Sequence, residues 1–275
     1  MNCKTGLHFW LQVRDMKCLN QNTMEKRTAL ITGATSGIGR ATATTLASQG
    51  FALILCGRRE ERLQELQSDL GSQTQVHTVK FDVRDREAVF QAISTLPKAF
   101  STIDILINNA GNAHGLDPID EGSMDDWDAM MDINVKGLLY VSKAVIPQMV
   151  ERKSGHIINI GSTAGKEVYP NGNVYCASKH AVDAINQGMR IDLNAHGIRV
   201  GAINPGLVET EFSQVRFKGD DNRAEKVYQG FQPLLPQDIA ELILFAVTRP
   251  SHVNIADLVV MPTAQASSTI VKKTL

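Results

Sequence analysis

Three side chains in the second half of the chain have the types and spacing needed to move a proton. Tyr175 and Lys179 stand four residues apart in a segment of helical pattern, so their side chains share one helix face. A phenol ionises near pH 10, and an ammonium within a few ångströms favours the phenolate and lowers that pKa. Ser162 follows an expected strand and adds a hydroxyl that could hold a carbonyl oxygen. Because a Tyr–Lys pair is common on helices, this group alone only suggests acid–base chemistry.

A glycine-rich turn near the start of the chain has the composition of a phosphate-binding loop. Glycines permit a tight turn and let the backbone approach a pyrophosphate at the positive end of the following helix. Three residues and then one separate the glycines, which differs from the usual dinucleotide-binding spacing. The turn therefore favours a dinucleotide site, with a turn that binds nothing as the alternative. The candidate contacts are Gly33, Thr35, Ser36, Gly37, Ile38 and Gly39.

The end of the second expected strand indicates which dinucleotide would bind. A site for NAD carries Asp or Glu there, which hydrogen-bonds the ribose hydroxyls. This chain has Gly57-Arg58-Arg59 instead, and a guanidinium can form paired hydrogen bonds with a 2′-phosphate, with no carboxylate at that point to repel it. The pattern therefore favours NADP, with Arg58 as the first candidate and Arg59 beside it. The alternative is that both arginines begin a solvated helix together with Glu60 and Glu61.

The elements that must position these residues alternate between strand and helix from Arg27 onward. Short, continuously apolar runs predict strands buried on both faces, and a helical stretch separates most of them. The strands are expected at Arg27–Thr32, Ala52–Cys56, Val76–Phe81, Asp104–Ile107, His156–Ile160, Arg199–Ile203 and Asp257–Val260, and the helices at Ile38–Ser48, Glu60–Leu70, Arg86–Leu96, Ser123–Ile133, Gly137–Glu151, Asn173–Ala195 and Pro236–Val247. This pattern predicts an α/β fold: a single-domain, Rossmann-type, doubly wound parallel sheet of about seven strands with helices on both faces.

Two segments depart from this alternation. Met1–Thr23 does not share the pattern and is expected to be a disordered extension, so the domain is predicted to span residues 24–275. Gly206–Gln232 is the one long stretch that reads as irregular, because it contains Gly219, Asp220, Asp221 and Gly230. Stretches of this kind in α/β enzymes often cover the active site, so we expect residues 206–232 to form a substrate loop.

Composition and charge exclude several classes of protein. The 275 residues include 28 basic and 29 acidic side chains, and no Lys/Arg-rich run indicates nucleic acid or an anionic membrane as a partner. The apolar stretches are far shorter than a bilayer span. The histidines are not grouped at metal-ligand spacing, so no metal site is expected. The four cysteines, Cys3, Cys18, Cys56 and Cys176, show no metal-type pairing. Cys56 ends an apolar run and Cys176 lies in a helical pattern, which suggests small packing residues in a reducing, cytoplasmic compartment.

Several separated motifs occur in a fixed order from Met24 to the C-terminus: Gly33–Gly39, Asp82-Val83, Asn108-Asn109-Ala110-Gly111, Asn134, Ser162, Tyr175 with Lys179, and Pro205-Gly206 with Thr210. Together, and in this order, they resemble the classical short-chain dehydrogenase/reductase family. The resemblance implies an enzyme that transfers a hydride between a nicotinamide dinucleotide and a CH–OH group. It implies four catalytic residues: Asn134, Ser162, Tyr175 and Lys179.

The same resemblance assigns parts of the cofactor to residues of this chain. Lys179 would bind the nicotinamide ribose as well as serve Tyr175, and Asn134 would anchor a water in the proton relay. Members that prefer NADP often carry Arg or Lys just before the second glycine, where this chain has Ser36, so the NADP expectation depends mainly on Arg58. The other implied contacts are Asp82 and Val83 with the adenine, Asn109, Ala110 and Gly111 beside the adenosine ribose, and Pro205, Gly206, Val208 and Thr210 around the nicotinamide.

Four segments of the C-terminal part carry a narrower resemblance: Glu209–Asp220, Val227-Tyr228, His252–Ile255 and Met261–Gln265. They resemble the NADP-dependent 3-hydroxy acid dehydrogenases, also known as serine 3-dehydrogenases or L-allo-threonine dehydrogenases. This implies reversible oxidation of a short 3-hydroxy acid such as serine or allo-threonine, or reduction of a related oxo compound. Arg216 is the first candidate to hold a substrate carboxylate or sulfonate. It could equally be a structural residue paired with Asp220 or Glu211.

Three other functions stay open at this point. Two are enzymatic, a sulfoacetaldehyde-type reductase and a 3-oxoacyl carrier-protein reductase. The third is a catalytically silent NADP-binding regulator on the same fold, which the presence of both Tyr175 and Lys179 disfavours. The family resemblance also implies a small-molecule substrate and a homotetramer, with Gly137–Glu151 and Asn173–Ala195 packed across a two-fold axis.

Overall fold

The computed structural model describes residues 27–274, which build one seven-stranded sheet. Every neighbouring pair of strands is parallel, in the order β3-β2-β1-β4-β5-β6-β7. The order reverses between β1 and β4, which is where open parallel sheets form a crevice for ligands. The strands are β1 (Thr28–Thr32), β2 (Ala52–Gly57), β3 (Val76–Lys80), β4 (Ile105–Asn108), β5 (Gly155–Ile160), β6 (Ile198–Pro205) and β7 (Asp257–Val260).

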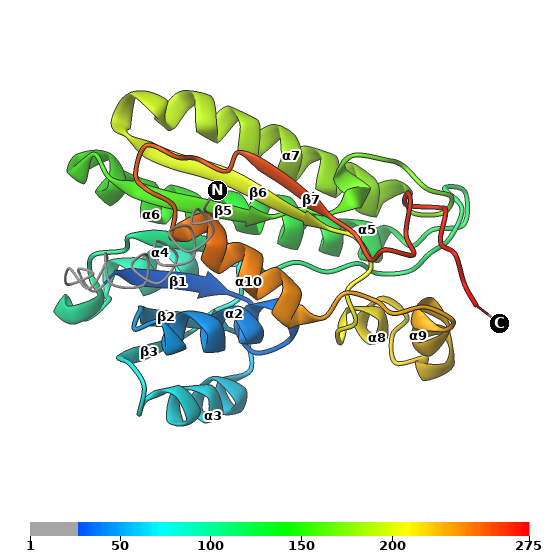
Figure 1. Cartoon of the computed structure of the whole chain (residues 1–275), viewed down its shortest axis with the longest axis horizontal. Coiled ribbons are helices and arrows are strands. Elements are labelled where there is room, and N and C mark those ends of the chain that lie inside the picture. Colours follow the sequence, from blue (N-terminus) through cyan, green and yellow to red (C-terminus); the bar gives the residue numbers. More distant parts are fainter. Residues whose placement is uncertain (1–26, 275) are drawn as a thin grey trace, which may run out of the picture.

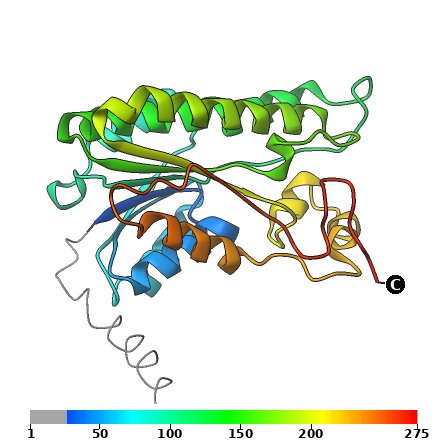
Figure 2. The ribbon, with the colours of Figure 1, turned by 45° about the horizontal axis from the view of Figure 1, so that its top comes forward.

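Helices cover both faces of this sheet, as Figures 1 and 2 show. One layer consists of α2, α3 and α10, and the other of α4, α6 and α7, with α5 packed against α7. The short helices α8 and α9 lie outside both layers, beside the last residues of the described chain (Figure 2). The helices are α2 (Gly37–Ser48), α3 (Glu60–Leu70), α4 (Arg86–Ser94), α5 (Met124–Met131), α6 (Leu138–Arg152), α7 (Asn173–Leu193), α8 (Phe212–Arg216), α9 (Asp221–Tyr228) and α10 (Pro236–Val247).

Each central strand contributes to two cores, because successive side chains point to opposite faces of a sheet. In β1, Ala29 and Ile31 pack in the core beneath α2, α3 and α10, whereas Leu30 packs in the core beneath α4, α6 and α7. In β4, Ile105 and Ile107 pack in the core beneath α2, α3 and α10, and Leu106 packs in the core beneath α4, α6 and α7. Strands buried on both faces must be apolar throughout, which is why these runs show no polar alternation.

The fold expected from the sequence is confirmed, and the expected elements are found with ends that differ by a few residues. The expectation of an irregular segment at Gly206–Gln232 is wrong, because α8 and α9 lie within it. Gly219 adopts a left-handed φ of 88° between them, and the Asp220 side chain caps α9 by accepting from Arg223 N at 3.1 Å. In the sequence, Gly219 and Asp220 indicated an irregular segment; in the structure they stand at the boundary between α8 and α9.

The N-terminal segment, the junction of two helices and the apolar character of the helices were also the subject of expectations from the sequence. The expected disordered extension at Met1–Thr23, together with Cys3 and Cys18, lies outside the described residues. The expected helices Ser123–Ile133 and Gly137–Glu151 are joined by a π-helical turn, Asp132–Gly137. No helix within residues 27–274 combines the length and the apolar character that a membrane crossing requires.

A buried histidine lies at the end of the sheet opposite the strands' carboxyl ends. His156 in β5 is 1% exposed, and neither ring nitrogen has a hydrogen-bond partner among the described residues. Burial lowers the pKa of His156 from 6.5 to about 3, and the positive charges of Arg199 and Arg27 add to this. The folded protein therefore keeps this imidazole neutral at pH values where the unfolded chain protonates it.

The stability of the fold should consequently fall as the pH drops below about 6.5. There the unfolded chain binds one proton more than the folded one at position 156, which costs about 1.4 kcal/mol per pH unit. The variant His156→Leu should lack this contribution, so the difference in free energy of unfolding between variant and wild type should grow between pH 7.5 and pH 5. Urea unfolding at a fixed protein concentration measures both curves; parallel curves would show that His156 does not titrate in this way.

Candidate functional site

A cavity of about 550 Å³ opens at the carboxyl ends of the strands. Its wall includes Gly33 after β1, Arg58 after β2, Asn109 after β4 and Ser162 after β5. Two of the expected residues, Gly39 and Asn134, are buried behind the wall. The expected residues that line the cavity are Gly33, Thr35, Ser36, Gly37, Ile38, Arg58, Arg59, Asp82, Val83, Asn109, Ala110, Gly111, Ser162, Tyr175, Lys179, Pro205, Gly206, Val208, Thr210 and Arg216.

The glycine-rich turn is held tightly against β4. Gly33 and Gly37 have φ values of 64° and 50°, a left-handed region that favours glycine. A Cβ on Gly39 would collide with the carbonyl oxygen of Gly33. The Asn109 amide donates to the carbonyl oxygens of Thr32 and Gly33 at 2.9 and 3.2 Å. The N-terminus of α2 therefore opens directly onto the cavity, a geometry suited to a phosphate group.

Arg58 is the most exposed cation at the end of β2. Its side chain is 61% exposed, and Nη1 lies 3.5 Å from Asp82 Oδ2. Asp82 is held more closely by Arg84, whose Nη2 donates to Oδ2 at 2.7 Å. Although partial burial acts in the opposite direction, the hydrogen bonds and charge of Arg84, with a contribution from Arg58, hold the pKa of Asp82 below its usual value. The guanidinium of Arg58 thus keeps most of its donors available at the cavity wall.

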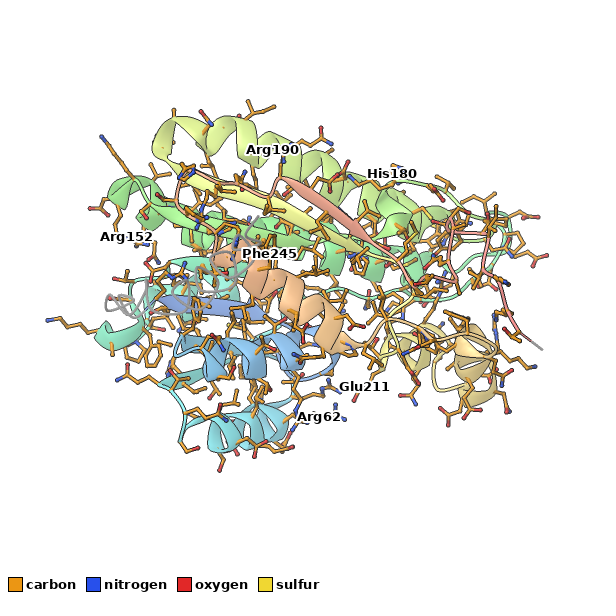
Figure 3. The ribbon with its side chains drawn as sticks, viewed as in Figure 1. Arg62, Arg152, His180, Arg190, Glu211 and Phe245 are labelled. Carbon is orange, nitrogen blue, oxygen red and sulfur yellow. The ribbon has the colours of Figure 1, made fainter. Side chains whose placement is uncertain are left out.

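Arg59 makes contacts that the sequence did not reveal. Its Nη2 donates to Thr35 Oγ1 at 3.1 Å, and its Nη1 pairs with Glu211 at 3.0 Å. Arg62 donates to the other oxygen of Glu211 at 2.7 Å, and Figure 3 shows these two side chains pointing toward one another. The segment that carries α8 is therefore tied to the start of α3. The sequence has no carboxylate at the end of β2, but folding brings Glu211 beside Arg59 and Arg62.

Tyr175, Lys179 and Ser162 are brought together as the sequence predicted. Tyr175 and Lys179 lie on one face of α7 and are 8% and 7% exposed. Ser162 begins the 3₁₀ turn η3 (Thr163–Gly165), where its Oγ accepts from Ala164 N at 3.1 Å. Burial lowers the pKa of Lys179 to about 8, while its Nζ donates to the Ile160 carbonyl at 3.1 Å. Burial therefore favours the neutral form of Lys179, and it does the same for the phenol of Tyr175.

The expectation that Lys179 lowers the pKa of Tyr175 is not borne out. Burial raises the pKa of Tyr175 above its usual value, and the nearby Tyr169 raises it further. The groups that act in the opposite direction are Ser162, through a hydrogen bond, and Arg216, through its charge. The loss of water around the phenol outweighs the hydrogen bond from Ser162 and the charge of Arg216, because the ring is almost fully enclosed.

Asn134 holds the loop after β4 in place. It belongs to the π-helical turn between α5 and α6 and is 2% exposed. Its side chain bonds both backbone groups of Asn112, accepting from N and donating to O at 2.8 Å each, and also donates to Ser178 Oγ at 3.0 Å. A Cβ on Gly111 would lie 3.1 Å from Asn134 Oδ1 and 3.6 Å from Lys179 Nζ. Both polar groups therefore converge on Gly111.

The segment after β6 closes the cavity on its other side. Gly206 N donates to Val260 O at 2.7 Å, and a Cβ on Gly206 would collide with the Gln265 side chain. A Cβ on Gly37 would lie 3.2 Å from Thr210 Cγ2, so this segment reaches the glycine-rich turn. Arg216, at the end of α8, pairs with neither Asp220 nor Glu211 within residues 27–274. Instead it donates to Gly115 O at 3.0 Å and to the Tyr169 hydroxyl at 3.1 Å.

Sequence reasoning missed several residues that shape this site. Arg62 lies in the first turn of α3, three residues after the N-cap Arg59, a spacing that could have suggested a shared face. Arg84, two residues after Asp82, carried no such signal, and neither did Tyr169, which lies in a turn outside every motif. Among the described residues, no group of three or more His, Cys, Asp or Glu side chains is placed to hold a metal ion.

The comparisons with known proteins agree with this geometry. The NADP-dependent 3-hydroxy acid dehydrogenase YdfG of Escherichia coli (strain K12) is 48% identical over 238 residues, which are 86% of this chain and 95% of that protein. Sulfoacetaldehyde reductase 2 of Chromohalobacter salexigens is 47% identical over 240 residues, 87% of this chain and 95% of the relative. The closed form of serine dehydrogenase complexed with NADP+ matches with a TM-score of 0.85 at 46% identity, covering 90% of this chain and 100% of that one. A sequence profile described as short chain dehydrogenase matches residues 27–221. The family inferred from the motifs is thus confirmed, and the chain belongs to the short-chain dehydrogenases.

Proposed function

We propose that this chain is an NADP(H)-dependent oxidoreductase that oxidises a short 3-hydroxy acid, such as serine or allo-threonine, or reduces the related oxo compound. The observation that carries the proposal is the joint position of Tyr175, Ser162 and Lys179 in one cavity with the glycine-rich turn. The names of its relatives support the cofactor and the substrate class, since they include an NADP-dependent 3-hydroxy acid dehydrogenase and a serine dehydrogenase complexed with NADP+.

In this mechanism the protein handles the proton and orients the reacting groups. The nicotinamide ring supplies or accepts the hydride when the cofactor is bound. In the oxidation direction Ser162 Oγ holds the substrate oxygen, and Tyr175 Oη takes its proton as the carbonyl forms. Lys179 Nζ favours the phenolate once its ammonium turns toward the phenol and the nicotinamide ribose. Asn134 would anchor a water that returns the proton to solvent.

The cavity wall fits the rest of the dinucleotide. The turn from Gly33 to Gly39, with Thr35, Ser36 and Ile38, would hold the pyrophosphate at the N-terminus of α2. Arg58, with Arg59 beside it, would bind the 2′-phosphate, because a guanidinium can form paired bonds with it. The remaining contacts would be Asp82 and Val83 with the adenine, Asn109, Ala110 and Gly111 beside the adenosine ribose, and Pro205, Gly206, Val208 and Thr210 around the nicotinamide.

A sulfoacetaldehyde-type reductase is the second candidate, because one relative carries the name sulfoacetaldehyde reductase 2. Both candidates present an anionic group a few bonds from the reacting carbon, and Arg216 in the cavity wall is the cation placed to receive it. A carrier-protein reductase or a silent regulator is less well supported, since neither explains both Arg216 and the intact pair Tyr175 and Lys179. A panel of 3-hydroxy acids and short aldehydes, followed by NADPH absorbance, separates these substrates.

We further propose that the protein acts as a homotetramer in the cytoplasm. The family resemblance supports the assembly, with α6 and α7 packed across one two-fold axis. The free thiols of Cys56 and Cys176 support a reducing compartment. Light scattering, which gives the mass in solution, decides the assembly.

Replacing Tyr175 with Phe should remove the proton acceptor and leave the cavity wall in place. We expect turnover to fall by roughly 10²–10⁴-fold, the usual contribution of a positioned acid–base group, while NADPH binding changes little. Lys179→Ala should lower both turnover and NADPH affinity, because its ammonium serves the phenol and the ribose. Initial rates and fluorescence titration with NADPH give the two quantities. Near-normal turnover of Tyr175→Phe would refute its assignment.

Replacing Arg58 with Asp should change the cofactor preference. A charge-assisted hydrogen bond contributes roughly 1.5–3 kcal/mol, so NADPH should bind about 10- to 150-fold more weakly. The new carboxylate repels the 2′-phosphate and can accept hydrogen bonds from the ribose hydroxyls of NADH, so the preference should move further toward NADH. Arg86→Asp, an exposed arginine outside the cavity wall, is the matched control. An unchanged ratio of NADPH to NADH affinity in Arg58→Asp would rule out the phosphate contact.

A further inference from the structure

We propose that Tyr169 is a positioning residue that fixes the Arg216 guanidinium beside the Tyr175 ring, so that one cation serves both the phenol and an anionic group of the substrate. The inference rests on the proposed function, because it takes Tyr175 as the proton-transfer residue. It gives the Tyr175 phenol a second source of positive charge, where the sequence suggested only Lys179.

Arg216 is held on several sides at once. Its Nε donates to Gly115 O at 3.0 Å, its Nη1 donates to the Tyr169 hydroxyl at 3.1 Å, and its carbonyl oxygen accepts from Gly115 N at 3.0 Å. The guanidinium carbon lies 5.6 Å from the ring centroid of Tyr169 and 5.6 Å from that of Tyr175, within the range of a cation–π contact. A guanidinium has five N–H donors, so these bonds leave donors over for an anion in the cavity.

Tyr169 is itself fixed by the turn in front of α7. Its carbonyl oxygen accepts from Gly172 N at 3.1 Å, and a Cβ on Gly172 would collide with its ring. The glycine therefore allows the aromatic ring to lie flat against the turn. Because this turn runs directly into α7, which carries Tyr175, the two rings that flank Arg216 belong to one rigid unit. The hydroxyl of Tyr169 is the only part of that unit that bonds the guanidinium.

The groups around the Tyr175 phenol come from several elements. Ser162 of η3 bonds the phenol and favours its ionised form, whereas Tyr169 and Cys176 disfavour it. Phe212 of α8 packs edge-on, with ring centroids 5.7 Å apart. Lys179 of α7 directs its ammonium to the Ile160 carbonyl at 3.1 Å. Arg216 is thus the cation that stands against the ring and offsets the burial that raises the pKa of Tyr175.

The position of the Arg216 guanidinium beside the Tyr175 ring also selects substrates by where their negative charge lies. A cation fixed beside the phenol stabilises an anionic group only when that group lies a few bonds from the carbon that Tyr175 and Ser162 address. The carboxylate of a 3-hydroxy acid and the sulfonate of a two-carbon aldehyde both satisfy this condition. Neutral carbonyl compounds would use Arg216 only through its effect on the phenol.

The test separates these two roles with a matched pair of substrates, 3-hydroxypropanoate and its neutral methyl ester. Oxidation of each by NADP+ is followed against pH in wild type, Arg216→Gln, Arg216→Lys and Tyr169→Phe. Arg223→Gln is the control: this arginine of the same segment packs on Phe217, which lines the cavity, but does not itself line the cavity. NADPH affinity, measured by fluorescence, shows for every variant that the fold and the cofactor site are intact.

In Arg216→Gln the acidic limb of kcat/KM for the neutral ester should move up by about one pH unit, because loss of a cation near the phenol favours its protonated form. KM for the acid should rise by about 10- to 150-fold and KM for the ester should stay the same. In Arg216→Lys the acidic limb of kcat/KM for the ester should lie between those of Arg216→Gln and wild type. Tyr169→Phe should move both quantities in the same direction by less, about 2- to 10-fold in KM, the worth of one hydrogen bond.

If the acidic limb of kcat/KM for the ester stays in place in Arg216→Gln, the electrostatic role of Arg216 is refuted. If Tyr169→Phe shows the pH profile and KM values of wild type, the positioning role of Tyr169 is refuted. Equal effects on acid and ester in either variant would also contradict the proposal. Absence of NADP-linked turnover in wild type would instead refute the proposed function, so the two failures are distinguishable.

Discussion

The structure depends above all on the parallel arrangement of its seven strands. The carboxyl ends of parallel strands all lie at the same edge of the sheet. Residues that are far apart in the sequence therefore meet at this edge when each of them follows a strand. Gly33, Arg58, Asn109 and Ser162 each stand just beyond a different strand and line one cavity. The tight contact of the glycine-rich turn with Asn109 fixes the two central strands relative to one another at this edge.

Burial is the strongest electrostatic influence in that cavity. It pushes Tyr175 and Lys179 toward their neutral forms, although the proposed reaction needs the phenolate in one direction. For Tyr175, the charge that counters burial is that of Arg216, which belongs to α8, outside the two helix layers that cover the sheet. Glu211 with Arg59 and Arg62 ties the α8 segment to the cofactor side, and Arg216 at the other end of α8 reaches the phenol.

The sequence allowed the central part of the account to be predicted. The strands, the helices and the pairing of Tyr175 with Lys179 follow from local patterns, because each depends on neighbours along one element, whereas the family motifs added Ser162 to the group. What could not be predicted depends on contacts between distant segments, such as Glu211 with Arg59 and Arg62. Gly219 and Asp220 were read as signs of irregular chain, although the same residue types also end and begin helices.

In the proposed reaction, Tyr175 and its neighbours serve a direct hydride transfer between substrate and NADP(H). Oxidation of a 3-hydroxy acid deuterated at its C3 carbon tests this most directly. Each molecule of NADPH formed should carry one deuterium at the nicotinamide C4, with no label released to water, as mass spectrometry of the isolated cofactor would show. Unlabelled NADPH, with the deuterium found in the solvent, would contradict it.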